Sequence, residues 1–106
     1  MIKASVMYPN NPNARFDMTY YLNTHMPMVT GALGAACLKA EIEKGVAGGT
    51  PGAEAPFVAI ANLYFDSLES FQQAFAPNAK KFAEDIPNYT DINADQRDSR
   101  LNRLRH

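Results

Sequence analysis

Hydrophobic and polar residues alternate along two short segments of the chain, and a third short segment is apolar almost throughout; both patterns predict β-strands. Apolar residues recur at every second position in residues 2–8 (IKASVMY). Residues 37–45 (CLKAEIEKG) alternate in the same way and have one polar face, which indicates a strand at the edge of the sheet. Residues 57–65 (FVAIANLYF) are apolar on both faces, as expected of a central strand covered on both sides.

Apolar residues spaced three or four apart predict a first helix, which begins after Asp17 and ends near Gly34. Asp17 suits the N-cap position because a short carboxylate can accept a hydrogen bond from the first turn. Glycine suits the end of a helix. The predicted buried stripe comprises Met18, Leu22, Met26, Val29 and Leu33.

A second helix is predicted to begin after Asp66, with Glu69 placed three residues later as in a capping box. A break is expected at Pro77, because proline cannot donate a backbone hydrogen bond. Its predicted buried stripe comprises Leu68, Phe71, Phe75, Ala79 and Phe82. After it come a turn and a short strand that is not expected to continue beyond Asp95.

The order of these elements, β-α-β-β-α-β, predicts an α+β fold of the ferredoxin-like type, with both helices on one face of the sheet. The strand 57–65 is apolar on both faces, so the uncovered face is expected to expose apolar side chains. The simplest partner for such a face is a second copy of the chain, packed sheet to sheet as a homodimeric α+β barrel. Residues 1–96 are interpreted as this domain.

Residues 97–106 contain four arginines and one aspartate, and they are interpreted as a polar, basic tail. Runs of charge are usually solvated, so a tail or a short surface helix is the preferred interpretation. Contact with an acidic partner is the alternative.

The composition narrows the class of protein. A chain of 106 residues with a net charge of −1 suits one globular domain and gives no indication of nucleic-acid binding. No apolar run reaches the roughly 20 residues that span a bilayer, and the first residues do not resemble a signal peptide. We therefore expect a cytoplasmic protein without a membrane segment. The single cysteine, Cys37, excludes an internal disulfide.

The stretch YYLNTHMP, residues 20–27, carries the main candidate chemistry. Pro27 should leave the Asn23 carbonyl without its helical donor and push Met26 away from helical angles. Helical spacing places Tyr21 and His25 together at the half-buried border of the helix. There His25 could exchange a proton near neutral pH, with the Tyr21 hydroxyl as a hydrogen-bond donor. The alternative is a structural histidine bonded to a carbonyl or carboxylate.

Other polar residues are candidates for binding a substrate. Asn62 interrupts an apolar strand, so it either ties the sheet together or faces a ligand. Tyr8 and Tyr64 are further candidates, although buried tyrosines more often belong to the core. Asp85 and Asp91 are interpreted as residues that cap turns.

The sequence lacks the glycine-rich phosphate-binding motifs, and its two histidines and one cysteine have no metal-ligand spacing. No cofactor and no metal are therefore expected.

Three segments, DMTYYLNTHMP, PFVAIANLYFDSLESFQQAF and DIPNYTDI, together resemble the EthD family of small dimeric α+β-barrel proteins. The resemblance extends from about residue 1 to residue 92. Its most specific part is the Tyr-x-x-x-His-x-Pro element, here Tyr21, His25 and Pro27. It implies the fold, the dimer and a pocket between sheet and helices, and it links the chain to proteins first associated with bacterial ether degradation.

Two functions remain open at this stage. The first is a cofactor-independent enzyme that uses acid–base chemistry on a small hydrophobic molecule, such as an aromatic, polyketide-like or lactone-like compound. The reaction would be an isomerisation, a cyclisation, a decarboxylation or an oxidation in which the substrate supplies the electrons. The second is a non-catalytic protein that binds a small ligand or assists a neighbouring oxygenase system.

Overall fold

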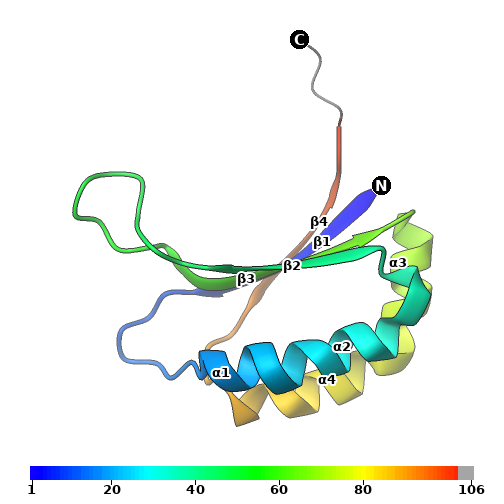
Figure 1. Cartoon of the computed structure of the whole chain (residues 1–106), viewed down its shortest axis with the longest axis horizontal. Coiled ribbons are helices and arrows are strands. Elements are labelled where there is room, and N and C mark those ends of the chain that lie inside the picture. Colours follow the sequence, from blue (N-terminus) through cyan, green and yellow to red (C-terminus); the bar gives the residue numbers. More distant parts are fainter. Residues whose placement is uncertain (103–106) are drawn as a thin grey trace.

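Four antiparallel strands form one sheet in the order β2-β3-β1-β4 (Figure 1). The computed structural model describes residues 1–102. The strands are β1 (Ile2–Pro9), β2 (Lys39–Lys44), β3 (Phe57–Phe65) and β4 (Asp95–Arg100). β3 and β1 occupy the centre and β2 lies at an edge. The apolar patterns predict the places of β3 and β2. The ferredoxin-like α+β fold is confirmed.

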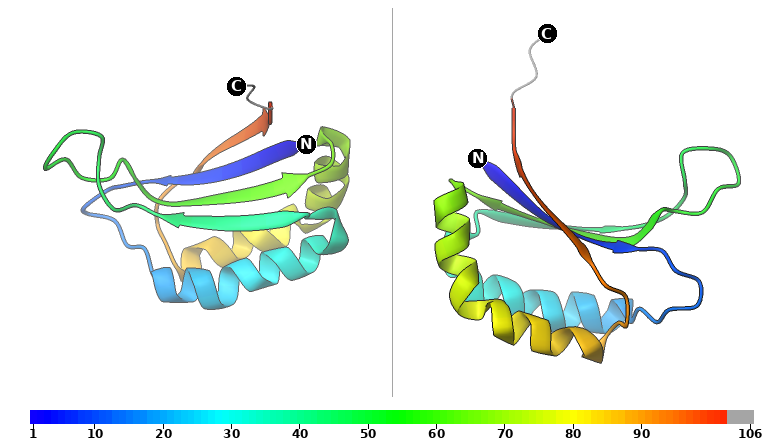
Figure 2. Two further views of the ribbon diagram at one scale, coloured as in Figure 1. Left: turned by 45° about the horizontal axis from the view of Figure 1, so that its top comes forward. Right: turned by 180° about the vertical axis from the view of Figure 1, so that it is seen from behind.

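Two helical segments cover one face of this sheet and leave the other face bare, as both views in Figure 2 show. The first segment consists of α1 (Met18–Tyr20), the π-helical turn η1 (Tyr21–His25), α2 (Met26–Leu33) and the short η2 (Gly34–Ala36). The second consists of α3 (Leu68–Phe75), η3 (Ala76–Asn78), α4 (Ala79–Asp85) and η4 (Ile86–Asn88). Among residues 1–102, none of these helices is long and apolar enough to cross a bilayer.

The start of each helical segment is set by a side-chain cap. The Asp17 carboxylate accepts a hydrogen bond from the Tyr20 amide at 3.0 Å, which confirms the predicted N-cap. At the second segment the predicted cap is wrong by one residue, because the Ser67 hydroxyl, not Asp66, accepts from the Ser70 amide. Serine competes well with aspartate for this position, so the two could not be separated by composition alone.

The turn η1 changes which side of the first helix is buried. The Met26 amide bonds to the Tyr21 carbonyl, five residues back, instead of the Leu22 carbonyl four residues back. Tyr21 therefore lies over Met26 and is only 1% exposed, whereas Leu22, predicted to be buried, is 44% exposed. The regular spacing predicted for this stripe fails because one extra residue is accommodated in a single turn.

The same turn accommodates Pro27 without distorting the backbone. Pro27 lies in the first turn of α2, where a missing amide donor costs little. Met26 has ordinary helical angles, φ −65° and ψ −40°, so the predicted displacement of this residue is wrong. The helix absorbs the proline by widening one turn before it instead of straining the preceding residue.

The second helical segment breaks at Pro77, as predicted, where η3 separates α3 from α4. Leu68, predicted to be buried, is 44% exposed at the start of α3.

Residues 97–100, predicted to belong to a tail, pair with β1 as part of β4. Pairing with β1 satisfies the backbone of β4 although its side chains are polar, which is why hydropathy did not reveal the strand. Residues 103–106 of the predicted tail lie outside the described residues.

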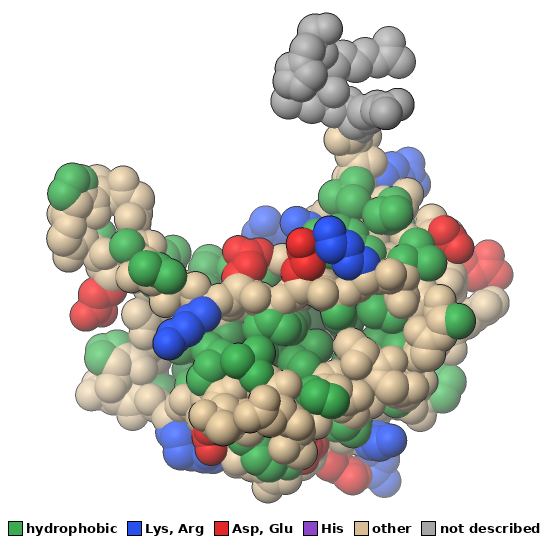
Figure 3. Space-filling view, in the orientation of Figure 1, with side chains coloured by type: hydrophobic (Ala, Val, Ile, Leu, Met, Phe, Trp, Pro, Cys, Tyr) green, Lys and Arg blue, Asp and Glu red, His purple; other side chains and the backbone are tan. Residues whose placement is uncertain are grey.

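The bare face of the sheet is less apolar than predicted. Met7, Ile60 and Tyr64 are only partly exposed there, but they share the face with charged neighbours from the edge strands. The cross-strand register places Glu41 opposite Asn62. Figure 3 shows the same division in space-filling form, with charged side chains along the sheet and along the helices and hydrophobic ones between the two layers.

Candidate active site

His25 and Tyr21 are both buried beneath the sheet, where the sequence predicted a half-buried border. His25 is 5% exposed and Tyr21 is 1% exposed. The turn η1 presents both side chains on the same side, and their rings stack with centroids 5.8 Å apart and planes inclined by 14°. The Tyr89 ring also contacts the imidazole, with centroids 4.5 Å apart, and lies 5.1 Å from the Tyr21 ring. His25, Tyr21 and Tyr89 thus form one cluster of three rings in mutual contact.

A cavity of about 390 Å³ lies between the helices and the covered face of the sheet, with His25 and Tyr21 in its wall. Most of the lining is contributed by apolar side chains of β1, β3, α2 and the second helical segment. The polar exceptions are Tyr8, Tyr21, His25 and Gln96. None of the residues that line this cavity within the described part of the chain is Lys, Arg, Asp or Glu. The cavity therefore suits an uncharged, largely apolar molecule.

Two buried polar groups in this wall, the Tyr21 hydroxyl and Nε2 of His25, form no hydrogen bond within residues 1–102. The exposed Gln96 side chain, also in the lining, forms none within the same residues. In the same residues, no fully enclosed polar side-chain atom lacks a partner. Both atoms therefore keep access to open space, and both residues line the cavity. An oxygen donor and a ring nitrogen are available to a bound molecule in an otherwise apolar wall.

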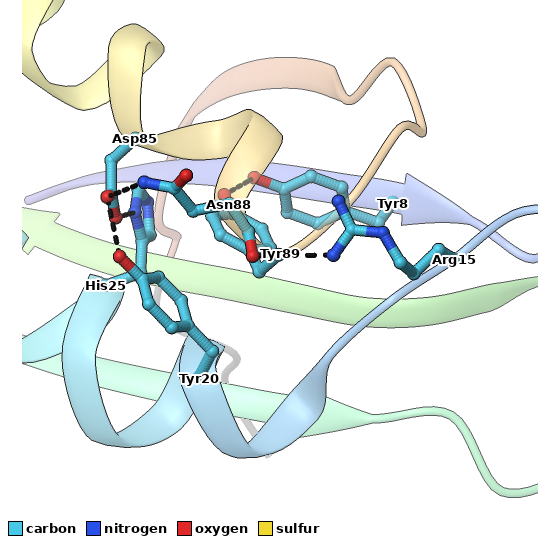
Figure 4. A network of polar contacts seen from close by, with 7 residues as sticks. All are labelled: Tyr8, Arg15, Tyr20, His25, Asp85, Asn88 and Tyr89. Carbon is cyan, nitrogen blue, oxygen red and sulfur yellow. Dashed lines mark hydrogen bonds and ion pairs between the residues drawn. The ribbon is translucent and has the colours of Figure 1, made fainter.

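The other ring nitrogen of His25 belongs to a polar network at the end of α4 (Figure 4). Nδ1 lies 2.9 Å from Oδ2 of Asp85. Oδ1 of Asp85 accepts from the Tyr20 hydroxyl at 2.8 Å and from the Asn88 amide at 2.9 Å. Burial alone would raise the pKa of Asp85, but the hydrogen bonds from His25, Asn88 and Tyr20 outweigh burial and lower it. Asp85 is therefore a carboxylate at neutral pH.

Two buried tyrosines form a hydrogen bond beside the cavity. The hydroxyl groups of Tyr8 and Tyr89 are 2.6 Å apart in the interior, linking β1 to the segment after α4. Burial raises the pKa of Tyr8, Tyr21 and Tyr89, so all three hydroxyls keep their protons at physiological pH. These tyrosines can donate hydrogen bonds but cannot serve as bases there.

The Tyr8–Tyr89 hydrogen bond gives a direct test of this packing. Tyr8→Phe or Tyr89→Phe alone should lower the free energy of unfolding by about 1–3 kcal/mol, because each leaves a buried hydroxyl without its partner. The double variant should lose less than the sum of the two, as measured by urea unfolding in a double-mutant cycle. Val46→Ala, in the exposed loop between β2 and β3, is the control, with a change within about 0.5 kcal/mol. Additive losses would show that the two hydroxyls are not coupled.

The lowered pKa of Asp85 predicts how stability depends on pH. Asp85 is deprotonated more easily in the folded state than in the unfolded state, whose pKa is near 3.8. Its contribution to stability should be complete above that pH and decline as the pH falls through the lower, folded value. Urea unfolding over this acidic range should therefore give a flatter pH dependence for Asp85→Asn than for the wild type. Tyr20→Phe removes one of the three donors and should fall between them, whereas parallel curves for the wild type and Asp85→Asn would contradict the assignment.

Asn62 and Tyr64 lie on the bare face of the sheet, opposite the cavity. The Asn62 side chain accepts from the Ser5 hydroxyl at 2.8 Å and donates to the Glu43 carboxylate. The Tyr64 hydroxyl donates to Glu41 at 2.6 Å. The structure thus brings together Tyr8, Tyr21 and His25 of the five predicted site residues, and Asn62 connects three strands of the sheet. Alternation along β3 separates these two residues from the cavity, since its cavity-facing positions are the odd-numbered ones.

The residues that sequence reasoning missed are the partners of His25. Asp85 was interpreted as a turn cap, and Tyr20 and Tyr89 were not linked to the site. Tyr89 is 0% exposed and contacts both Tyr8 and His25. Only the fold brings residue 85 to residue 25, so no local spacing could have shown the pair. Asp91, also interpreted as a cap, accepts from the Arg15 amide at 2.9 Å and so holds the loop before α1.

Comparison with known proteins places this architecture among proteins of one family. The family described as the EthD domain matches residues 14–93. No curated protein matches the chain.

Three solved structures are similar over most of the chain. An EthD-like protein from Ralstonia eutropha JMP134 is 45% identical with a TM-score of 0.88, over 92% of this chain and 88% of the other. An ethyl tert-butyl ether D (EthD) family protein from Bacillus halodurans C-125 is 21% identical with a TM-score of 0.59, over 90% and 96%. The protein At3g17210 of Arabidopsis thaliana shares the fold, with 13% identity and a TM-score of 0.71 over 100% of both chains. The match over residues 14–93 and the 45% identity with the Ralstonia protein show that this chain belongs to the EthD family.

Proposed function

We propose that this protein is a cofactor-independent acid–base enzyme acting on a small, uncharged, hydrophobic molecule that has an enolisable carbonyl group. The observation that carries the proposal is the pair of unpartnered polar atoms, the Tyr21 hydroxyl and His25 Nε2, in the wall of an otherwise apolar cavity. The volume of about 390 Å³ lies within the range of sites for small molecules. EthD membership supports the fold and the cavity without specifying a reaction.

The proposed step moves one proton. Nε2 of His25 takes a proton from the carbon next to the carbonyl, and the electron pair of that bond forms a carbon–carbon double bond. The carbonyl π electrons move to its oxygen, where the Tyr21 hydroxyl donates a hydrogen bond to the developing negative charge. The imidazolium then returns the proton to the oxygen or to another carbon. Removal of this proton is the common first step of isomerisation and of aldol-type cyclisation, and an apolar wall strengthens both interactions.

Exchange of carbon-bound hydrogen in D₂O tests this proposal. Purified protein is first denatured to release and identify any bound small molecule by mass spectrometry. That molecule, and the neutral aromatic ketone 2-tetralone as a probe, are then followed by NMR for loss of protons next to the carbonyl. We expect faster exchange with the wild type than with Tyr21→Phe or His25→Gln. A retained ligand that binds equally to all three proteins and exchanges at the buffer rate would favour the non-catalytic binding protein.

We also propose that the protein acts as a homodimer through the bare face of the sheet. The partly exposed Met7, Ile60 and Tyr64 form the apolar part of that face. The edge strand β2 adds Lys39, Glu41 and Glu43 to it, and β4 at the opposite edge adds Asp95 and Arg97. A two-fold axis parallel to the strands would bring β2 of one copy over β4 of the other. It would place Arg97 level with Glu41, a favourable pair, and Asp95 level with Glu43, so the proposed contact depends on Arg97.

Light scattering at micromolar concentration should therefore report about twice 11.7 kDa. Arg97→Glu should weaken the dimer because it places a negative charge opposite the β2 glutamates. Lys80→Glu, on the solvent side of α4, makes the same charge change away from the face and is the control. A well-folded monomer of the wild-type protein would contradict the proposal.

A further inference from the structure

Asp85 is placed so that it faces both the cavity wall and the solvent. Its Oδ2 contacts Nδ1 of His25, whose side chain is 6% exposed, whereas the Asp85 side chain itself is 19% exposed. Its outer side lines an open groove of about 300 Å³ between α2 and α4. Lys81 and Glu84 are the charged side chains in that groove, and the side chains packed on His25 from the inner side are the neutral Tyr21 and Tyr89.

The two carboxylate oxygens of Asp85 have different hydrogen-bond partners. Oδ1 is engaged by the Asn88 amide, which can only donate to a carboxylate, and by the Tyr20 hydroxyl. Among the described residues, only His25 contacts Oδ2. A carboxylate can only accept, so Nδ1 of a neutral His25 must carry the hydrogen. The hydrogen on Nδ1 leaves the lone pair on Nε2, the nitrogen that no residue within 1–102 bonds.

We propose that Asp85 is a positioning residue that fixes His25 in the tautomer with hydrogen on Nδ1, so that Nε2 presents a lone pair to the cavity. The tautomer follows from the hydrogen-bond geometry alone, whereas the role of His25 Nε2 as a base rests on the proposed function. When Nε2 takes a proton, the carboxylate also stabilises the imidazolium from the side away from the substrate. Tyr20 and Asn88 keep Asp85 oriented while this occurs.

The variant Asp85→Asn should invert the tautomer for a reason that the network itself supplies. The introduced side chain carries one oxygen and one NH₂ group. Tyr20 and Asn88 both donate at the Oδ1 position, so the new oxygen is held there and the new NH₂ group is directed at His25. Nδ1 must then accept, and the hydrogen moves to Nε2. An Asp→Asn change beside a catalytic histidine is known to act in this way in serine proteases.

Nitrogen-15 NMR of the imidazole ring measures this arrangement without a substrate. The sequence contains two histidines, so a His106→Asn background leaves His25 as the sole signal. At a pH where the ring is neutral, we expect Nδ1 to have the shift of a protonated nitrogen and Nε2 that of an unprotonated one. Asp85→Asn should exchange the two patterns. Glu84→Gln alters the neighbouring carboxylate, which pairs with Lys80 instead of His25, and should leave them unchanged.

Hydrogen on Nε2 in the His106→Asn protein, or an unchanged ring pattern in folded Asp85→Asn, would overturn the proposal. If Asp85→Asn does not fold, the spectrum of the His106→Asn protein still decides the tautomer. The 2-tetralone exchange assay separates this inference from the proposed function. Exchange with the wild type that falls about 10²-fold or more in Asp85→Asn, but not in Glu84→Gln, supports both. The predicted tautomer without exchange on any probe would contradict the function and leave the role of Asp85 in setting the tautomer intact.

Discussion

Replacing His25 with glutamine should lower the rate of carbon–hydrogen exchange by about 10²- to 10⁴-fold, the range attributed to a positioned acid–base group. Glutamine is close in size to histidine and can still donate to Asp85, but it has no ring nitrogen that can take a proton. The free energy of unfolding should change by only about 1–2 kcal/mol, because the polar contact is largely kept. The measurement is the exchange rate of 2-tetralone at a concentration below saturation, beside urea unfolding of the same samples.

Asn23→Ala is the matched control for His25→Gln. Asn23 lies in the same π-helical turn but is exposed, and it is not among the cavity-lining residues. The Asn23→Ala variant should have an exchange rate within about twofold of the wild type, because the substitution removes no contact to the cavity. If His25→Gln retains the full rate while it folds normally, His25 is a structural residue and the proposed mechanism is wrong. A large loss of stability with unchanged exchange per folded molecule would lead to the same conclusion.

Phe65→Ala should destabilise the fold by about 3–5 kcal/mol, the largest loss of stability expected for a change to one side chain here. Phe65 is 0% exposed at the end of the central strand β3, and its ring packs on Phe71 with centroids 5.0 Å apart. Truncation removes this contact between sheet and helix and leaves a void that the backbone of a central strand cannot close. Urea unfolding at neutral pH measures the loss.

Val46→Ala is the control for Phe65→Ala, since Val46 is 90% exposed on the loop between β2 and β3. Its effect should stay within about 0.5 kcal/mol. Comparable losses for the two variants would mean that the packing between Phe65 and Phe71 contributes little. Phe65 is not among the residues that line the cavity. A Phe65→Ala protein that folds should therefore bind the same small molecules as the wild type, in the same order of affinity.

Local patterns predicted the fold well because each strand and helix has a periodicity that burial requires. Residues 57–65 were assigned as a strand with the observed bounds, since Asn62 is the one interruption in a short apolar run flanked by turn residues. β4 was the exception, because a polar edge strand is held by backbone hydrogen bonds that do not depend on its side chains.

The candidate site was only partly predictable from the sequence. Tyr21 and His25 were found together because helical spacing is local, and Tyr8 joins them in the cavity. Asp85 lies 60 residues from His25 in the chain, and its contact depends on how the second helical segment packs. For Asn62 the sequence left two roles open, because it does not state which face of a central strand the helices will cover; the hydrogen bonds to Ser5 and Glu43 match the role of tying the sheet together. The sheet order and the handedness of the connections settle that choice.

The π-helical turn Tyr21–His25 confines one extra residue to a single turn, so the helix before it and the helix after it stay in phase. If an exposed residue of this turn, for example Asn23, were deleted, the Met26 amide would bond to the Tyr21 carbonyl at the ordinary spacing of four residues. Tyr21 would then stay over Met26, and only the residues between them, His25 included, would change position. A change of chain length at this point therefore acts on the site without displacing the rest of the helix.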